Sequence, residues 1–276
     1  MKNWIIYTTS IFISLNVISQ KQIKSFDDAI KEFNSGNYEL SIPYFKRIAF
    51  FESNNILNLK YLADSYQNTK SFDKALVHYS LIYNISKNDS IKNEVIIEMA
   101  KTYILQEKYN YAKIEALNIK EINQTFTDRK NYYLSIISFY MNEFENSKNY
   151  LLSISSLSDS SKQIISKLYN GAEKNHLKPN PKVASFLSMI LPGAGQVYSG
   201  EFKSGINSFL LTGAALTAFT IINIRYSFLD AILGVFPYYQ RYYTGGVINA
   251  QKMAEKKNKM KRLETVIKIN EIIIDL

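Results

Sequence analysis

Few residues in this sequence are suited to catalysis or metal binding. It contains two histidines, His78 and His176, and no cysteine, which excludes thiol catalysis, disulfides, Cys-ligated zinc and iron–sulfur clusters. Neither histidine has partners at a spacing typical of a metal site or a catalytic triad. We expect His78 to be exposed beside a core tyrosine, Tyr79, and we expect no catalytic residues, no metal and no cofactor. The default prediction is therefore a protein that is not an enzyme.

A second candidate for chemistry is the glycine-containing segment 191–200, LPGAGQVYSG. Gly193 and Gly195 suggest a nucleotide-binding loop, but no strand precedes them, no third glycine has the required spacing and no Lys-Ser/Thr pair follows. Neither a Rossmann nor a Walker site is supported. Instead, the glycines are expected to let the backbone turn sharply, while Gln196 and Tyr198 cap freed backbone groups.

The elements that surround these residues begin with a repeat. Aromatic residues recur with spacings of 34, 37 and 35, at Tyr38, Phe72, Tyr109 and Phe144. A small residue lies three positions after each and nine before each, and an isoleucine lies ten after each, at Ile48, Ile82, Ile119 and Ile154. Offsets of 3, 7 and 10 share one face of a helix. We predict helical hairpins that stack, because no single hairpin can bury this face alone.

Four segments carry this frame: NSGNYELSIPYFKRI, QNTKSFDKALVHYSLI, LQEKYNYAKIEALNI and YMNEFENSKNYLLSI. They resemble the tetratricopeptide repeat (TPR) family over about residues 25–156, although the consensus tryptophan and the closing proline are missing. One more amphipathic helix, 159–176, is expected to cap the stack, which gives a repeat domain over 25–176.

The TPR resemblance implies a scaffold that binds a peptide or protein in a groove lined by the first helix of each hairpin. The residues that this register places in the groove are Lys60, Asp64, Gln67, Lys101, Ile104, Tyr132, Ile136 and Phe139. The alternative for Ile136 and Phe139 is that they belong to the core between repeats.

Two apolar segments indicate export and membrane attachment. Residues 1–19 have a positive start and an apolar stretch typical of a signal peptide, with cleavage before Gln20; an uncleaved anchor is the alternative. After a Pro-containing linker at 177–182, the segment 204–224 has no charge across 21 residues, which is long enough to span a bilayer. A second, weaker span is expected over about 227–248, with a kink at Pro237. A single span and a buried soluble hairpin remain alternatives.

The segment after the linker resembles the PGxGQxY-x-G signature that opens the two-span TM2 domain of bacterial membrane proteins. The residues that carry this resemblance form the predicted membrane-entry turn: Pro192, Gly193, Gly195, Gln196, Tyr198, Gly200 and Gly205. The polar Arg–Asp turn often found between the spans of TM2 proteins is not clearly present. The resemblance implies a membrane hairpin over 183–250.

A basic segment follows, and it forms the predicted amphipathic tail, 251–276. The residues expected to contact anionic lipid are Lys252, Lys256, Lys257, Lys259, Lys261 and Arg262. A solvated helix face is the alternative. The chain carries a net charge of +9, but nucleic acid is not an expected partner of an exported protein.

With 46% hydrophobic and 21% charged residues, the chain has enough apolar material for a core. We predict an all-α protein with a TPR-type solenoid followed by a membrane-associated helical hairpin. The expected function is a scaffold in a bacterial cell envelope, anchored to the inner or outer membrane with its repeats in the periplasm, that binds a protein partner in envelope assembly, secretion or transport. The alternative is a membrane-integral component whose Gly-rich hairpin oligomerises or assists translocation.

Overall fold

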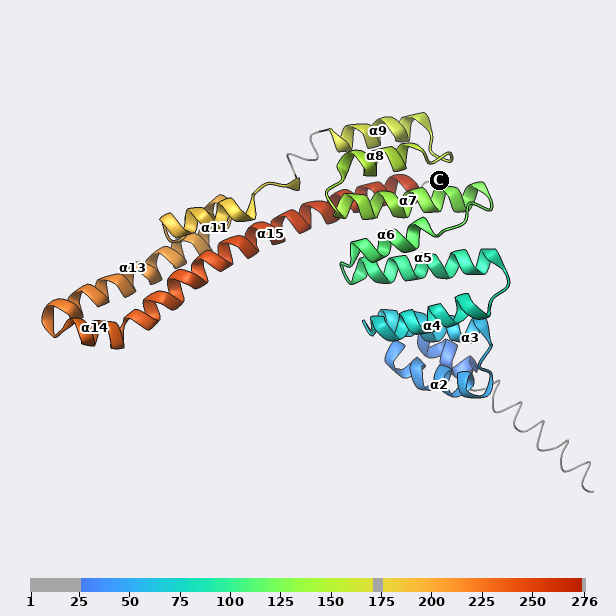
Figure 1. Ribbon diagram of the computed structural model, residues 1–276, viewed down its shortest axis with the longest axis horizontal. Helices are drawn as coiled ribbons and strands as arrows, with labels where there is room; N and C mark the ends of the chain where they lie inside the picture. Colours follow the sequence, from blue (N-terminus) through green and yellow to red (C-terminus); the bar gives the residue numbers. More distant parts are fainter. Residues whose placement is uncertain (1–25, 171–175, 275–276) are drawn as a thin grey trace, which may run out of the picture. The chain divides into compact units, whose positions relative to one another are not determined.

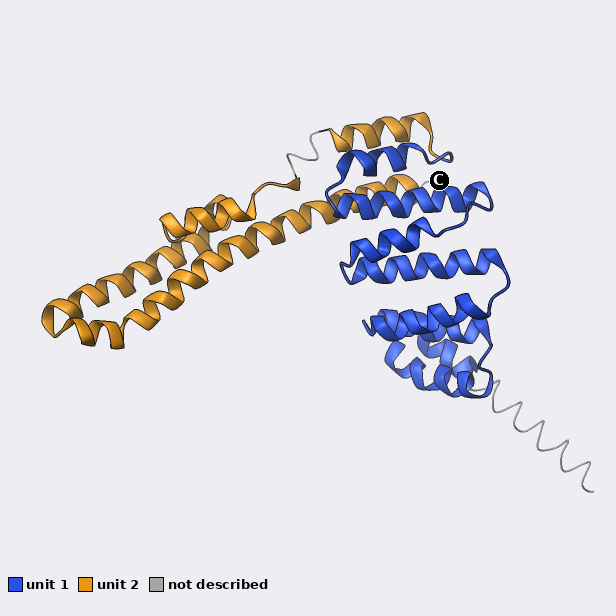
Figure 2. Ribbon diagram, in the orientation of Figure 1, with its two compact units in different colours: residues 1–156 blue, residues 157–276 orange. Residues whose placement is uncertain are grey.

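The computed structural model describes residues 26–170 and 176–274, and within these ranges the chain is helical and contains no strand (Figure 1). The all-α prediction is therefore confirmed. The chain divides into two compact units, residues 1–156 and 157–276 (Figure 2). The predicted signal peptide, 1–19, and its cleavage before Gln20 lie outside the described residues.

Unit 1 is a series of antiparallel helices in which each packs against the next in sequence (Figure 1). Residues 26–34 are helical. The helices that follow are α2 (Tyr38–Phe51), α3 (Ile56–Asn68), α4 (Phe72–Ile85), α5 (Asp89–Leu105), α6 (Tyr109–Leu117), α7 (Gln124–Tyr140) and α8 (Phe144–Leu152). Each of the four repeated aromatic residues is thus the first residue of a second helix, α2, α4, α6 or α8.

The buried face of these helices follows the predicted register. The four isoleucines are at most 4% exposed. The small residues three positions after each aromatic are fully buried: Ser41, Ala75, Ala112 and Ser147. Where serine replaces alanine it gains a partner, since Ser147 Oγ donates to the carbonyl oxygen of Ser135, 2.8 Å away on the facing helix. Small side chains therefore lie where the two helices of a hairpin approach most closely.

The turn that precedes each of the four repeated aromatic residues contains one residue with left-handed backbone, two positions before the aromatic. These residues are Gly36, Lys70, Glu107 and Asn142, with φ between 59° and 78°. In each turn the next residue donates its N–H to the carbonyl five residues earlier, as Lys108 does to Tyr103 at 2.9 Å. This is the Schellman motif, which satisfies carbonyls at the end of the first helix. These turns were not predicted from the sequence, because only one of the four uses glycine.

Glycine at the left-handed position should stabilise unit 1. The left-handed conformation costs a residue with a Cβ about 1–2 kcal/mol, and glycine avoids this cost. Part of the gain is offset because glycine makes the unfolded chain more flexible, so that more entropy is lost on folding. We therefore expect Glu107→Gly and Lys70→Gly to raise unfolding free energy by about 1 kcal/mol each. Asn142→Gly should gain less, because asparagine tolerates this conformation.

The measurement is thermal unfolding of the full-length chain in detergent, with circular dichroism as the signal. Gly36→Ala is the matched reverse change. A Cβ at Gly36 meets no atom within 4 Å, so any loss of stability comes from the left-handed backbone conformation and not from a steric clash with a neighbour. A fall in the unfolding midpoint for Glu107→Gly would contradict the prediction.

Unit 2 contains α9 (Asp159–Tyr169), α11 (Pro181–Ile190), α12 (Ala194–Tyr198), α13 (Phe202–Arg225), α14 (Phe228–Gly234) and α15 (Phe236–Ile274). Helix α15 has 39 residues and packs along both α11 and α13 (Figure 1). Within the predicted capping helix, 159–176, the structure has α9 over Asp159–Tyr169, and this helix groups with unit 2. The predicted linker, 177–182, overlaps α11, because Asn180 caps this helix and Pro181 is its first residue.

The second predicted span, 227–248, is not one helix. The short α14 ends at Gly234, and α15 begins at Phe236. Pro237 does not kink a helix either, because it lies in the first turn of α15, where a backbone donor is not needed. The predicted hairpin and tail, 183–250 and 251–276, are joined inside this one long helix.

Candidate functional site

Two groups of residues are candidates for function, one in each unit. The first is the first-helix face, defined here as the polar side chains that α3, α5 and α7 present together. The second is the glycine turn, residues 191–205, with the helices that contact it.

On α3, the first-helix face begins with a three-residue network. Lys60 Nζ lies 2.8 Å from Asp64 Oδ2, and Tyr79 donates its hydroxyl hydrogen to Asp64 Oδ1 at 2.6 Å. Burial and the Asp64 carboxylate raise the pKa of Tyr79, so the phenol remains a donor. Burial alone would lower the pKa of Lys60, but the hydrogen bond to Asp64 and the negative charges of Asp64 and Glu98 together outweigh it, and the pKa is raised. Lys60 therefore stays charged at neutral pH.

Gln67 joins α3 to α5. Its Nε2 donates to Thr102 Oγ1 at 2.7 Å and to the Glu98 carbonyl oxygen at 3.4 Å. On α5, Lys101 Nζ lies 2.8 Å from Glu98 Oε1 and 5.9 Å from the centre of the Tyr133 ring. A cation above an aromatic face gains electrostatic energy from the ring, so α7 also holds this lysine in place.

Arg129 joins α7 to α5 through a two-pronged ion pair with Glu94. Arg129 Nη2 lies 2.8 Å from Glu94 Oε2, and Nη1 contacts Oε1. The arginine lowers the pKa of Glu94, so the carboxylate stays ionised. Nearby on α7, burial raises the pKa of Tyr132 to about 12, which keeps its hydroxyl protonated.

The cations and carboxylates of this face neutralise one another. Lys60, Lys101 and Arg129 match Asp64, Glu94 and Glu98, and each has a partner. These pairs hold long side chains in defined positions, which reduces the entropy lost when a ligand binds. The face is therefore pre-organised, polar and neutral.

The structure brings together some of the predicted groove residues and not others. Lys60, Asp64, Gln67 and Lys101 form the networks above, and Ile104 and Tyr132 are partly buried. Ile136 and Phe139 are wrong as groove residues: they are 5% and 0% exposed, and Phe139 packs edge-on against Phe144. They are core residues, as the alternative predicted.

Sequence reasoning missed four residues of the first-helix face: Glu94, Glu98, Arg129 and Tyr133. The signal for two of them was available, because Glu94, Glu98 and Lys101 recur at spacings of four and three along α5. The pairing of Arg129 with Glu94 joins residues 35 positions apart, and no short pattern indicates it.

In unit 2, the glycine turn contains positions that no larger residue can occupy. Gly193 has φ +92°, and a Cβ there would lie 2.2 Å from the Gly205 carbonyl oxygen. A Cβ at Gly195 would lie 1.8 Å from the Ala184 carbonyl oxygen. Pro192 follows the end of α11, and Gly200, at φ +86°, precedes α13. The glycines thus place α12 in backbone contact with α11 and α13.

Gln196 is the buried centre of the glycine turn, 1% exposed. Its Oε1 accepts a hydrogen bond from Ser188 Oγ at 2.8 Å, and Ser188 Oγ accepts one from the Gly195 N–H at 3.0 Å. Its Nε2 donates to the Gly246 carbonyl oxygen at 2.8 Å. One amide therefore connects α11, α12 and α15. Tyr198 also binds backbone as expected, since its hydroxyl accepts from the Asn180 N–H at 3.2 Å.

Small residues let α15 approach its neighbours. Gly246, Ala250 and Ala254 recur at every fourth position and lie on one face of α15. Ala250 and Ala254 are buried with Ala184 of α11, and a Cβ at Gly246 would lie 2.5 Å from Ser208 Oγ. This stripe was not predicted from the sequence.

Among the six predicted lipid-contacting side chains, at least Lys257 and Lys261 bind the chain itself. Lys257 Nζ donates to the Ser199 carbonyl oxygen at 3.0 Å, and Lys261 Nζ donates to that of Lys178 at 2.8 Å. Of the others, Lys252, Lys256 and Lys259 are exposed and Arg262 is partly buried.

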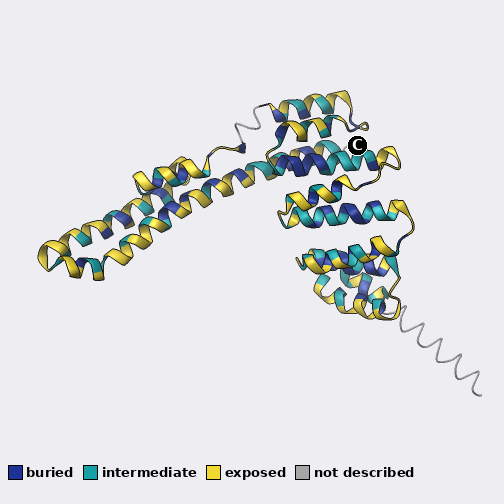
Figure 3. Cartoon of the chain, in the orientation of Figure 1, coloured by how far each residue is buried: buried dark blue, intermediate teal, exposed yellow. Residues whose placement is uncertain are grey.

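Helix α13 exposes large apolar side chains. It is the one helix among residues 26–170 and 176–274 that is long and apolar enough to cross a membrane, and 17% of its most apolar stretch is buried. Figure 3 shows exposed residues along both α13 and α14. The exposed apolar residues of α13 include Phe202, Ile206, Phe209, Leu210, Leu216, Ile221 and Ile224.

No family model, curated protein or solved structure matches this chain. The resemblances to the TPR and TM2 families therefore rest on the motifs quoted above.

The histidines have structural surroundings. His78 is partly buried rather than exposed, because its ring stacks on Tyr66 with centres 5.6 Å apart. His176 is 6% exposed, and its Nε2 lies 3.2 Å from Thr265 Oγ1. Burial lowers the pKa of both, which favours the neutral ring. Across the part of the chain that the structure describes, no His, Asp and Glu side chains cluster in a group able to hold a metal.

Proposed function

We propose that this chain is an exported scaffold of a bacterial cell envelope, anchored in a membrane by α13, which binds a protein partner through the first-helix face. The observation that carries the anchor is the 17% burial of the most apolar stretch of α13. A core helix of a water-soluble protein buries most of such a surface, and contiguous exposed apolar area of this length is rare outside interfaces and membranes.

The TPR-like register supports the scaffold part of the proposal. It places the repeated isoleucines and small residues in the core, which leaves the first-helix face free to carry polar side chains. A neutral face with fixed donors, acceptors and aromatic rings suits a protein segment better than a highly charged ligand. The partner would act in envelope assembly, secretion or transport.

The second candidate function is a membrane-integral component in which the helical hairpin itself does the work. One observation favours it. Two small residues of α13 lie on a side that no other described residue covers: a Cβ at Gly213 would meet no atom within 4 Å, and Ala214 is exposed. Small residues let two membrane helices approach closely, so a second copy or another membrane protein can pack against α13 there.

Membrane integration is tested by alkaline carbonate extraction followed by labelling of single cysteines. The chain has no cysteine, so Lys203, Ser227 and Lys259 can be replaced one at a time. We expect the protein to resist carbonate, and we expect labelling from the periplasm at positions 203 and 259 with position 227 protected. Labelling at position 203 alone would indicate that the chain crosses the membrane once, at α13, and that positions 227 and 259 lie on the far side. Release of the protein by carbonate would show that unit 2 is a soluble module.

Partner binding is tested by photocrosslinking from the full-length chain in its own membrane. A photoreactive residue replaces Lys60 on the first-helix face or, as the control, Val77 on α4, which is 66% exposed. We expect a discrete crosslinked protein from position 60 and none from position 77. Crosslinks from 77 alone would place the binding surface on the second helices.

A further inference from the structure

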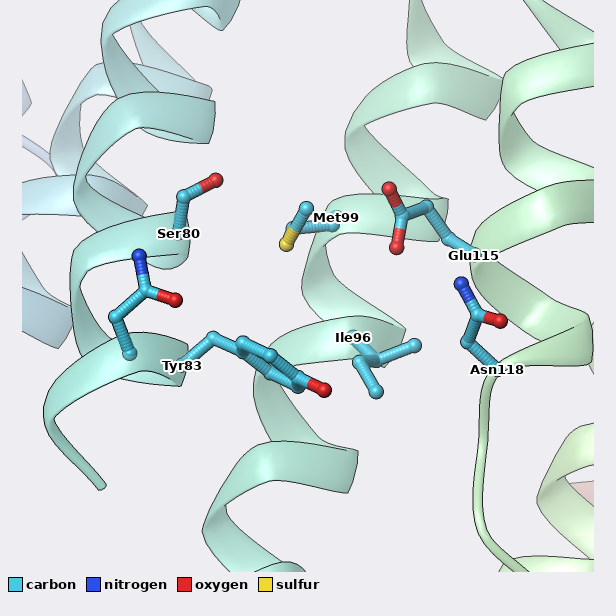
Figure 4. Close-up of a pocket in the computed structure, with 7 residues that line it drawn as sticks. Ser80, Tyr83, Ile96, Met99, Glu115 and Asn118 are labelled. Carbon is cyan, nitrogen blue, oxygen red and sulfur yellow. The ribbon is translucent and has the colours of Figure 1, made fainter. Parts of the chain in front are cut away.

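Unit 1 contains a pocket on a different side of α5 from the first-helix face. It has a volume of about 320 Å³ and lies between α4, α5 and α6 (Figure 4). Helix α4 contributes Ser80, Tyr83 and Asn84, helix α5 contributes Ile96 and Met99, and helix α6 contributes Glu115 and Asn118. This volume is in the range of small-ligand sites.

Among the described residues that line this pocket, Glu115 alone is charged. Its carboxylate has no hydrogen-bond or ion-pair partner among the described residues, and burial raises its pKa. The lysines nearest in sequence do not neutralise it, because Lys113 pairs with Glu143 at 2.9 Å and Lys120 pairs with Asp89 at 2.7 Å. A partly buried carboxylate without a counter-ion gains from a cationic ligand.

The remaining groups specify what kind of cation fits. Figure 4 shows Ser80 on one side of the pocket, Glu115 and Asn118 on the other, and Ile96 and Met99 between them; Asn84 also lines the pocket. The amide and hydroxyl oxygens can accept the hydrogens that an ammonium group donates, and the two apolar side chains can pack an aliphatic stem. An anion would be repelled by Glu115.

We propose that this pocket binds a primary ammonium group on an aliphatic stem, with Glu115 as its counter-ion and the amides of Asn84 and Asn118 as further partners. Such a group is carried by a lysine side chain of a peptide or by a free alkylamine. The proposal is independent of the membrane anchor and of the first-helix face. On α5, Ile96 and Met99 lie roughly opposite Glu94, Glu98 and Lys101, so both surfaces can be occupied together.

The test uses the Met99 methyl group as a local reporter. The full-length chain is labelled with ¹³C-methyl methionine, held in detergent, and titrated with pentylamine, with lysine blocked at both backbone ends, and with pentanol as the neutral analogue. Met99→Leu assigns the signal. We expect a saturable shift of the Met99 signal with at least one ammonium compound and none with pentanol at the same concentration.

Two variants decide whether the pocket itself is responsible. Glu115→Gln keeps the shape of the side chain and should weaken ammonium binding about tenfold or more, since hydrogen bonds to charged groups contribute about 1.5–3 kcal/mol. Ser80→Leu should block the pocket while Glu115 remains. The matched control is Glu145→Gln, which changes an exposed carboxylate of α8 and should leave binding unchanged.

The outcomes separate the sources of the ligand. Tighter binding of blocked lysine supports a lysine side chain of a peptide, and equal or tighter binding of pentylamine supports a free amine. An absence of any Met99 shift overturns the proposal, and so does an equal response to pentanol. A response that survives Glu115→Gln, in a variant with an unchanged circular dichroism spectrum, also overturns it.

Discussion

Replacing Leu210 with lysine should abolish stable integration of the protein into the membrane. Leu210 lies near the middle of α13 and is 60% exposed, so the new charge would face hydrocarbon rather than another helix. A lysine at the centre of a membrane helix costs about 2.5–3.5 kcal/mol on insertion scales, and replacing leucine also loses its favourable contribution. About 3 kcal/mol corresponds to a change of more than a hundredfold in the insertion equilibrium. The measurement is the fraction of full-length protein that resists alkaline carbonate.

Two controls separate charge from other effects of this change. Leu210→Ala removes apolar area without adding charge and should leave most of the protein integrated. Val77→Lys adds the same charge on α4, at a site that is 66% exposed, and should have no effect on extraction. If Leu210→Lys resists carbonate as well as the unmodified protein does, then α13 does not lie in hydrocarbon and the anchor proposal fails.

The second large effect is expected at the glycine turn. Gly195→Ala adds one methyl group at a position 1.8 Å from the Ala184 carbonyl oxygen, a distance that forces α12 away from the backbone of α11. Overpacking typically lowers the free energy of unfolding by about 1–3 kcal/mol. Here the new methyl group meets a backbone carbonyl, which cannot rotate away as a side chain can, so we expect a loss of about 3 kcal/mol or more. The shift would also break the hydrogen bonds of Gln196 to Ser188 and Gly246.

Gly213→Ala is the matched control for this prediction. It makes the same chemical change in a helix of the same unit, where the new methyl group meets no atom within 4 Å. It should be neutral or stabilise α13 by up to about 1 kcal/mol, because alanine has the higher helix propensity. Thermal unfolding in detergent compares the two variants. Equal stability of Gly195→Ala and Gly213→Ala would show that the close contact between α11 and α12 does not exist in solution.

The helices of unit 1 were predictable because their signal is local and repeated. Each repeated aromatic begins a second helix, and each repeated isoleucine is buried. The turns were not predictable from glycine and proline, since Lys70, Glu107 and Asn142 adopt left-handed backbone without glycine. Here the hydrogen bonds of the Schellman motif and the packing of the two helices outweigh the steric cost at one residue.

The functional residues were less predictable, because they depend on contacts between distant positions. Gln196 was singled out from its motif, but its bond to Gly246, 50 positions away, depends on how α15 packs. Phe139 was placed in the groove by register, yet the structure buries it. Helix periodicity identifies a face and does not say whether neighbouring helices cover it.

The left-handed turn makes the repeats interchangeable at their junctions. At Lys70 and at Glu107 the chain has the same backbone conformation, with the same two hydrogen bonds behind it and an aromatic residue two positions ahead. The segment 71–107 therefore begins and ends in matching geometry, and a second copy inserted after Glu107 would continue the array without a new connector. Each repeat contacts its neighbours through the same register. Such an insertion would therefore add the folding free energy of one repeat and its interface, together with the exposed surface of one more helix pair. Gain or loss of whole helix pairs can thus change the length of the repeat array without changing its fold.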